Sequence, residues 1–582
     1  MELFWPLLAQ NLPVVKNFPL TLRVELEQEL ARDLWQPLLA ELQMPGTIPE
    51  QWPRRLLDLY HLTALAGLSL SELPARLTQG LGEDVPTDAI LTALTRWRDY
   101  CWREGLLTYG IVAELYGQHL WPHGYYQRKL RERFAYLLAD DVDEYPALLA
   151  TVAAGLLGND VPALFTFNPH GAARLGLGAD PAAWQELRCR CHVHTLTVAP
   201  GLAPIVPAVL ATLASAYGTE AVPQTYGLEA PSRGKLLRQT AQAIATGLAA
   251  GSFAPGEVAI IAPGLDSLAA YAIAEILGHQ GWEVIPLDEQ RPLWLVPPVR
   301  ALIALMALVY PGLGRTLSRD RVAEMLAVLV PTIDPVRAGL LADCAYRPDP
   351  DRPELLPSES LAEWYRLGYA ASTAYEDLRT WVQAQKAGDV PLLFFDRAIR
   401  QWLLPRYGDF ASRRLLQELL ETTQHYWQMG SRLHWPAPEI RQRFVHTLMQ
   451  GAVAANPFVP EVPATAIVVA TIYQYRTARL HHRYQFWLDS GSPLWTQGGR
   501  VALFGAPLLL RSWDGTPLSP TQTAAADRDR LERLLADLLE RAGDGICLCA
   551  SETDARGQPQ DGPLSPLALT AAPWPPYNVE EN

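Results

Sequence analysis

Apolar side chains recur at helical spacing through the first 130 residues. One stripe of leucines repeats every four positions between acidic and polar residues, so its members lie along one face of a helix: Leu26, Leu30, Leu34 and Leu38. A second helical pattern covers residues 91–120, and turn-forming residues interrupt the chain at 45–46 and at 80–86. We therefore expect a helical N-terminal region.

From about residue 136 the pattern changes to short apolar runs that alternate with helices. Residues 136–139 and 163–167 form the first two runs, with a helical stretch between them. Farther along, residues 258–261, 268–277 and 284–287 have the pattern of a strand, a helix and a strand. Because consecutive parallel strands need a crossover helix, this unit predicts a parallel sheet covered by helices.

Residues 299–455 return to a helical pattern, with Arg, Glu and Trp on the polar faces. Three prolines within residues 456–463 then predict a stiff connector. Strand patterns resume at 467–472 and continue at 486–488 and 546–549, with a helix over residues 524–542. The order predicts an α/β domain into which a helical block is inserted.

The charge of the chain argues against a surface built chiefly to coat nucleic acid. The formal net charge is −14 at pH 7, whereas phosphate binding needs clustered Lys and Arg. At 582 residues, with 49% hydrophobic and 19% charged side chains, the chain has material for two or three domains with well-formed cores.

The cysteines and the apolar stretches indicate which cellular compartment to expect for the protein. Six cysteines are too few and too unevenly placed for a disulfide framework in this chain, which favours a reducing environment. No basic segment precedes the first apolar run, so we expect no signal peptide. The uncharged stretch 195–219 could span a bilayer, but Pro200, Pro204 and Pro207 interrupt it, which favours a strand, a turn and a core helix. We expect a cytoplasmic protein with no membrane partner.

Five segments carry a family resemblance, in this order along the chain: residues 100–109 (YCWREGLLTY), 137–144 (LLADDVDE), 167–181 (FNPHGAARLGLGADP), 469–480 (VATIYQYRTARL) and 530–542 (RLERLLADLLERA). The first resembles a helix that leads into a Gly-Leu-Leu segment, and the second resembles an apolar strand that ends in carboxylates. Together with the inserted helical block, these segments resemble the UvrD/Rep/RecB-type superfamily 1 DNA helicases and their AddB-like relatives.

The resemblance implies an α/β fold of P-loop-NTPase-like (RecA-like) motor domains with parallel sheets and helical insertions. Residues 1–188 would be the remnant of the first motor domain, with helical additions. Residues 189–298 and 464–550 would form the second motor domain, and residues 299–455 the inserted helical domain. The remaining residues, 551–582, are rich in Gly, Pro, Asp and Ser, and we expect a loosely ordered tail.

In the family, the strand at the position of residues 137–139 ends in carboxylates that hold Mg²⁺ and orient the attacking water. The resemblance implies Asp140 as the metal-binding carboxylate and Asp141 as its catalytic neighbour, although Asp141 is one methylene shorter than the expected Glu. Asp143 replaces the Gln that senses the γ-phosphate. The structural alternative for this cluster is an acidic helix N-terminus that interacts with the helix dipole.

Three arginines match family positions that contact phosphate or DNA. Arg541 aligns with a phosphate-sensing Arg, and a solvated helical Arg is the alternative. Arg476 keeps the positive charge of a segment that faces both phosphate and strand, while Arg479 replaces a Glu of that segment. The resemblance implies that Arg476 and Arg479 contact DNA.

The segment 167–181 keeps the length of the family's loop and its closing Gly-Ala-Asp-Pro. Its polar contacts are replaced at four positions: Asn168, Gly171, Arg174 and Leu177. The Asn-Tyr-Arg triplet that follows in the family has no counterpart, because no Arg occurs between Arg190 and Arg233. A loop that couples nucleotide to single-stranded DNA has therefore lost its contacts.

The printed sequence contains no Gly-x-x-x-x-Gly-Lys-Ser/Thr loop, the segment whose backbone N–H groups hold the phosphates of ATP. Its one Gly-Lys pair, Gly234-Lys235, is followed by Leu236 and lies after the acidic segment, in the wrong order. We interpret this pair as unrelated to nucleotide binding.

Two other groups of residues have structural interpretations. Residues 189–194 (CRCHVH) would place their cysteines and histidines on opposite sides of a strand, so we predict a half-buried strand and no metal. Cys547 and Cys549 fit a core strand. Tryptophans such as Trp97 and Trp487 could stack on bases, although core packing is the default.

Three functions remain open. The first is a helicase-related protein of DNA repair or recombination that has no ATPase activity, needs no cofactor and serves as a DNA-handling or partner-binding scaffold. The second is an active ATP-dependent DNA helicase, with ATP and Mg²⁺, whose phosphate-binding segment is missing or supplied separately. The third is a protein interaction scaffold with no DNA role. Under the first two, the partners are single-stranded or duplex DNA and a subunit of a repair or recombination assembly.

Overall fold

The computed structural model describes the chain except for residues 1–3, 13–14, 16, 39–50, 158–160, 197–200, 216–220, 288–291, 361–366, 389, 455–462, 498–502 and 575–582. The chain divides into two compact units. The first comprises residues 1–22, 30–288 and 459–582, and the second comprises residues 23–29 and 289–458. The predicted connector at 456–463 lies almost wholly outside the described residues.

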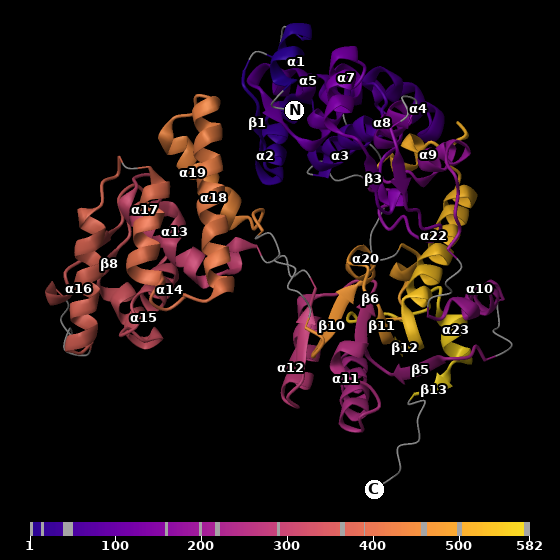
Figure 1. The fold of residues 1–582 in the computed structure, drawn as a ribbon. Helices are drawn as coiled ribbons and strands as arrows, with labels where there is room; N and C mark the ends of the chain where they lie inside the picture. Colours follow the sequence, from indigo (N-terminus) through magenta and orange to yellow (C-terminus); the bar gives the residue numbers. More distant parts are fainter. Residues whose placement is uncertain are drawn as a thin grey trace. The chain divides into compact units, whose positions relative to one another are not determined.

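A parallel sheet of seven strands organises the first unit, in the order β13-β5-β12-β11-β6-β10-β7 (Figure 1). The strands are β5 (Thr225–Ala230), β6 (Val258–Ala262), β7 (Glu283–Pro286), β10 (Ala466–Thr471), β11 (His482–Leu488), β12 (Ala542–Ser551) and β13 (Ala572–Pro573). The α/β class predicted from the sequence is confirmed. The strands at 258–261 and 467–472, expected in one α/β domain, do lie in one sheet, where β6 and β10 are neighbours.

Both faces of the sheet are covered, as a parallel sheet requires. One face packs against α11 (Arg233–Ala249) and α12 (Ser267–Gly278). The other packs against α10 (Val206–Ala214), α22 (Pro520–Glu540) and α23 (Ser565–Thr570). The central strands β6 and β10 are buried on both sides, which explains why they are continuous apolar runs.

The N-terminal part of the first unit is mostly helical, and its elements are α1 (Trp5–Asn11), α2 (Val24–Trp35), α3 (Trp52–Leu65), α4 (Leu73–Leu81), α5 (Thr87–Glu104), α6 (Tyr109–Glu114) and α7 (Gly124–Arg133). The first few residues of α2 group with the second unit. Two small parallel sheets accompany these helices: β1 (Leu20–Thr21) with β2 (Leu106–Leu107), and β3 (Leu137–Ala139) with β4 (Ala163–Phe165). The second of these packs one face against α8 (Ala147–Leu157) and α9 (Pro181–Gln185).

The described residues of the second unit form helices and one short antiparallel strand pair. These elements are α13 (Pro297–Val309), α14 (Arg319–Leu329), α15 (Pro335–Cys344), β8 (Tyr346–Arg347), β9 (Glu354–Leu355), α16 (Tyr369–Ala384), α17 (Pro391–Ala398), α18 (Phe410–Arg432) and α19 (Ala437–Met449). Helix α13 is buried nearly all round, as its apolar sequence demands. Among the described residues of the chain, no helix is long and apolar enough to cross a membrane.

Two local predictions were wrong. Residues 189–194 do not form a strand: a short 3-10 helix covers Glu186–Arg190, and the residues that follow are irregular and largely exposed. The segment offers too little apolar surface to bury a strand face. The tail is also not loose as far as Trp574, because Leu564 and Leu567 are fully buried and β13 pairs with β5.

The tryptophans singled out for base stacking are core residues. Trp97 and Trp487 are fully buried, so neither ring face is open to a base. Cys547 and Cys549 are likewise buried on β12, as expected for a core strand.

The buried His482 makes the stability of the sheet depend on pH. It begins β11, its Nδ1 lies 3.0 Å from the Tyr475 hydroxyl, and burial lowers its pKa to about 4. Because the unfolded state takes up this proton near pH 6.5, the stabilisation is complete above that pH and is lost as pH falls toward 4. We expect the unfolding free energy of the wild type to fall more steeply than that of His482→Gln, by about 1.4 kcal/mol per pH unit within this window. Urea titrations from pH 7 to 4.5 measure both slopes, and equal slopes would contradict the assignment.

Candidate functional site

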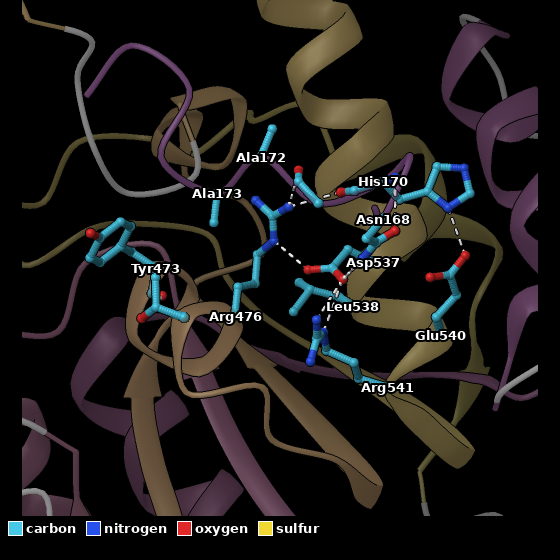
Figure 2. A network of polar contacts seen from close by, with 12 residues as sticks. Asn168, His170, Ala172, Ala173, Tyr473, Arg476, Asp537, Leu538, Glu540 and Arg541 are labelled. Carbon is cyan, nitrogen blue, oxygen red and sulfur yellow. Dashed lines mark hydrogen bonds and ion pairs between the residues drawn. The ribbon is translucent and has the colours of Figure 1, made fainter. Parts of the chain in front are cut away.

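Four of the five segments that resemble helicase motifs, all but residues 100–109, meet in the first unit. The acidic turn after β3 (residues 140–144) and the loop after β4 (residues 166–174) meet α20 (Ile472–Thr477) and the C-terminal turn of α22. Thr471 caps α20: its hydroxyl accepts from the Gln474 N–H, and the Gln474 side chain accepts from the Thr471 N–H. This short capped helix presents Arg476 to the loop, as Figure 2 shows.

Arg476 is 8% exposed, and its guanidinium binds groups of the same chain. Its Nε donates to Asp537 Oδ2 at 2.6 Å. Its Nη2 donates to the carbonyls of His170 and Gly171 at 3.0 and 2.9 Å. The planar fork of N–H groups thus ties the loop after β4 to α22 (Figure 2). The expectation that Arg476 contacts DNA conflicts with this buried placement.

Asp537 is the acceptor at the centre of this network, and it is 2% exposed. Besides Arg476 it binds Arg541, whose Nε and Nη2 lie 3.0 and 2.9 Å from its Oδ1. The Asn168 amide adds a long hydrogen bond of 3.4 Å. Arg541, which was expected to sense a phosphate, therefore pairs with Asp537, one helical turn earlier along α22. One turn onward from Asp537, the Glu540 carboxylate lies 2.6 Å from His170 Nδ1.

Arg479 forms ion pairs with Asp140 and Asp141, the two carboxylates that were expected to bind Mg²⁺ and to orient the attacking water. Its Nη1 lies 2.8 Å from Asp140 Oδ2, and its Nη2 lies 2.6 Å from Asp141 Oδ2. The Thr166 hydroxyl donates to Asp140 and accepts from the Asp141 N–H at 2.7 Å. Asp141 and Arg479 both have positive φ, at 48° and 53°, which non-glycine residues adopt at a cost.

The two carboxylates differ in acidity. The Thr166 hydroxyl and then Arg479 lower the pKa of Asp140. Burial raises the pKa of Asp141, against the attraction of Arg479. A pair with divided pKa values is typical of acid–base centres, but here one guanidinium lies on both carboxylates. Among the described residues, no group of three or more His, Cys, Asp or Glu side chains is placed to hold a metal ion.

The last two acids of the turn hold the backbone of the loop. Asp143 accepts from the N–H groups of Asn168 and Ala172 at 2.8 and 2.9 Å. Glu144 accepts from those of Ala173 and Arg174 at 2.6 and 2.8 Å, and burial raises its pKa. These four bonds satisfy donors that would otherwise lack partners. The Asp143 carboxylate, at the position of the family's γ-phosphate-sensing Gln, is engaged by the loop backbone.

Sequence reasoning brought Asp140, Asp141, Arg476, Arg479 and Arg541 to attention, and the structure gathers all five. It missed their partners: Thr166, Asn168, His170, Asp537 and Glu540. The spacing of four between Asp537 and Arg541 on one helix was a readable signal for that pair. Nothing in the sequence indicates that the Arg476 guanidinium donates to carbonyl groups some 300 positions away.

No protein-family model matches the chain, and no curated protein matches it.

Gly171 tests how tightly this loop is held. A Cβ there would lie 2.0 Å from Asp143 Oδ2, and Asp143 cannot withdraw because it is buried and bound to two N–H groups. We expect Gly171→Ala to destabilise the protein by roughly 1–3 kcal/mol in urea unfolding. Gly234→Ala is the control, since a Cβ at that helical position meets nothing within 4 Å. Equal urea midpoints for the two variants would show that the loop shifts to accommodate the added Cβ.

Arg476 and Arg479 should differ sharply in their effect on stability. Arg476→Ala leaves the buried Asp537 with one cation fewer, and we expect a loss of about 3 kcal/mol. Arg479→Ala breaks ion pairs in which the arginine side chain is 47% exposed, so we expect less than about 1 kcal/mol. Chemical denaturation of both variants measures the difference. A larger loss of stability for Arg479→Ala than for Arg476→Ala would refute the assignment of Arg476 as the buried link between the loop after β4 and α22.

Proposed function

We propose that this protein is a UvrD-like, helicase-related scaffold of DNA repair or recombination that handles DNA or a partner without hydrolysing ATP. The support for the family begins with the order of the five motif-like segments. It continues with the parallel sheet whose strands β7 and β10 are separated in sequence by the helices of the second unit. In this proposal the sheet is RecA-like.

The observation that carries the absence of hydrolysis is the occupation of Asp140 and Asp141 by Arg479. A hydrolytic centre needs one of these carboxylates for Mg²⁺ and the other for the attacking water. Here one guanidinium of the same chain forms ion pairs with both carboxylates. Arg541, which would stabilise the γ-phosphate, is likewise bound to Asp537.

The buried polar network gives such a scaffold a reason to keep motif-like residues. Arg476, Asp537 and Arg541 hold together the loop after β4, α20 and α22, which is a structural task. A protein under pressure to retain this packing would preserve these side chains even without turnover.

We expect purified protein to release phosphate from ATP at the same rate, with or without single-stranded DNA, as its Asp140→Ala/Asp141→Ala variant. The reason is that the printed sequence has no Gly-x-x-x-x-Gly-Lys-Ser/Thr loop to hold the phosphates, while Arg479 pairs with both carboxylates. Asp343→Ala/Asp351→Ala, which removes two exposed acids in the second unit, is the charge-matched control. DNA-stimulated turnover that is lost only in the first double variant would establish an active helicase instead.

A further inference from the structure

We propose that the exposed face of α7 and the residues after it, Phe134 to Tyr136, bind single-stranded nucleic acid. We call this the α7 face. It deepens the proposed DNA-handling function by naming a surface for it, and it lies apart from the buried Arg476. The elements concerned, α7 and β3, are labelled in Figure 1.

The α7 face concentrates positive charge in an acidic protein. Residues 128–134 (RKLRERF) carry four cations and one acid, whereas the whole chain has a net charge of −14. Among the described residues, no carboxylate lies within ion-pair distance of Arg128, Arg131 or Arg133; only Lys129 has one, Glu132 at 2.6 Å. Elsewhere, arginines such as Arg300 and Arg443 are paired with glutamates. Cations without acidic partners are available to phosphates.

Exposed rings are interleaved with these cations. Tyr125, Phe134 and Tyr136 are 45%, 51% and 69% exposed, so their ring faces are open to a ligand. Lys129 Nζ lies 6.0 Å from the Tyr125 ring centre, and the Arg133 guanidinium lies 5.7 Å from that of Phe134. A phosphate bound at either cation would therefore place its base within reach of a ring.

Helix α7 arranges three of these groups along one line. Tyr125, Lys129 and Arg133 are four residues apart on α7, so they share a face about 12 Å long. The backbone is then extended at Phe134, bends at Ala135 and enters β3 directly after Tyr136. This geometry suits a short run of nucleotides.

The rings decide between single strands and duplex. A solvated helical face explains cations alone, and a duplex can also bind them, but neither explains three exposed rings. Ring stacking requires base faces that a duplex hides and a single strand offers, in DNA or RNA alike. The phosphate backbone of the nucleic acid supplies negative charge to Arg128, Arg131 and Arg133, which have no carboxylate partner among the described residues.

Fluorescence anisotropy with labelled oligo-dT and oligo-U of about 15 nucleotides, beside a hairpin duplex, tests this proposal. We expect the wild type to bind a single strand more tightly than the hairpin. Phe134→Leu/Tyr136→Leu should weaken binding roughly tenfold. Tyr369→Leu/Phe410→Leu, which removes the same two ring types from exposed positions in the second unit, should leave it unchanged.

The cations have their own readout, the salt dependence of affinity. Arg128→Ala/Arg133→Ala should reduce the slope of log affinity against log salt by about 1.4, since each phosphate contact adds about 0.7. Arg413→Ala/Arg414→Ala, two exposed arginines on α18, is the matched control. Circular dichroism checks that each variant is folded.

Binding that no α7 variant alters, or a preference for the hairpin, would overturn the α7 face and leave a DNA-handling scaffold standing. No binding at low salt would overturn both the α7 face and the DNA-handling part of the proposed function, while the ATP measurement stays independent. If sedimentation velocity instead shows self-association that Phe134→Leu/Tyr136→Leu abolishes, the face is a protein interface and the proposal fails.

Discussion

The ion pair between Arg476 and Asp537 is the interaction on which the rest of the site depends. Both side chains are almost fully buried, so each charge needs partners inside the protein, and each is a main partner of the other. Arg476 also binds two carbonyls of the loop after β4, and Asp537 also binds Arg541. The pair thereby fixes one loop and two helices that are far apart in the chain. Breaking it would leave a buried charge with fewer partners in a region of low dielectric.

The outer layer of the site is held by weaker interactions. Arg479, Asp140 and Asp141 meet nearer the solvent, where each ion pair contributes little to stability. Asp143 and Glu144 bind backbone N–H groups and shape the loop that receives Arg476. The site therefore has a buried ion pair at its centre and more exposed ion pairs nearer the solvent. Carboxylates in the segment that resembles a motor motif, Asp143 and Glu144, hold backbone N–H groups.

Much of the sheet could be predicted from the sequence, because buried parallel strands are short apolar runs such as β6 and β10. The helical block between β7 and β10 was visible for the same reason, as a change in periodicity. The strand at 189–194 was wrong because the segment has too little apolar surface to bury a strand face. The loose tail was wrong because its burial depends on distant partners, such as Phe486 beside Trp574. The five candidate side chains could be named but their partners could not, because Arg479 and Asp140 are 339 positions apart.

A double-mutant cycle on Arg476 and Asp537 tests most directly whether these motif-position residues hold the fold. The variants are Arg476→Met, Asp537→Leu and the two combined, compared by urea unfolding. We expect each single variant to be strongly destabilised and the double variant to recover much of the loss, with a coupling energy of about 2 kcal/mol. Additive losses, with a coupling below about 0.5 kcal/mol, would contradict the account.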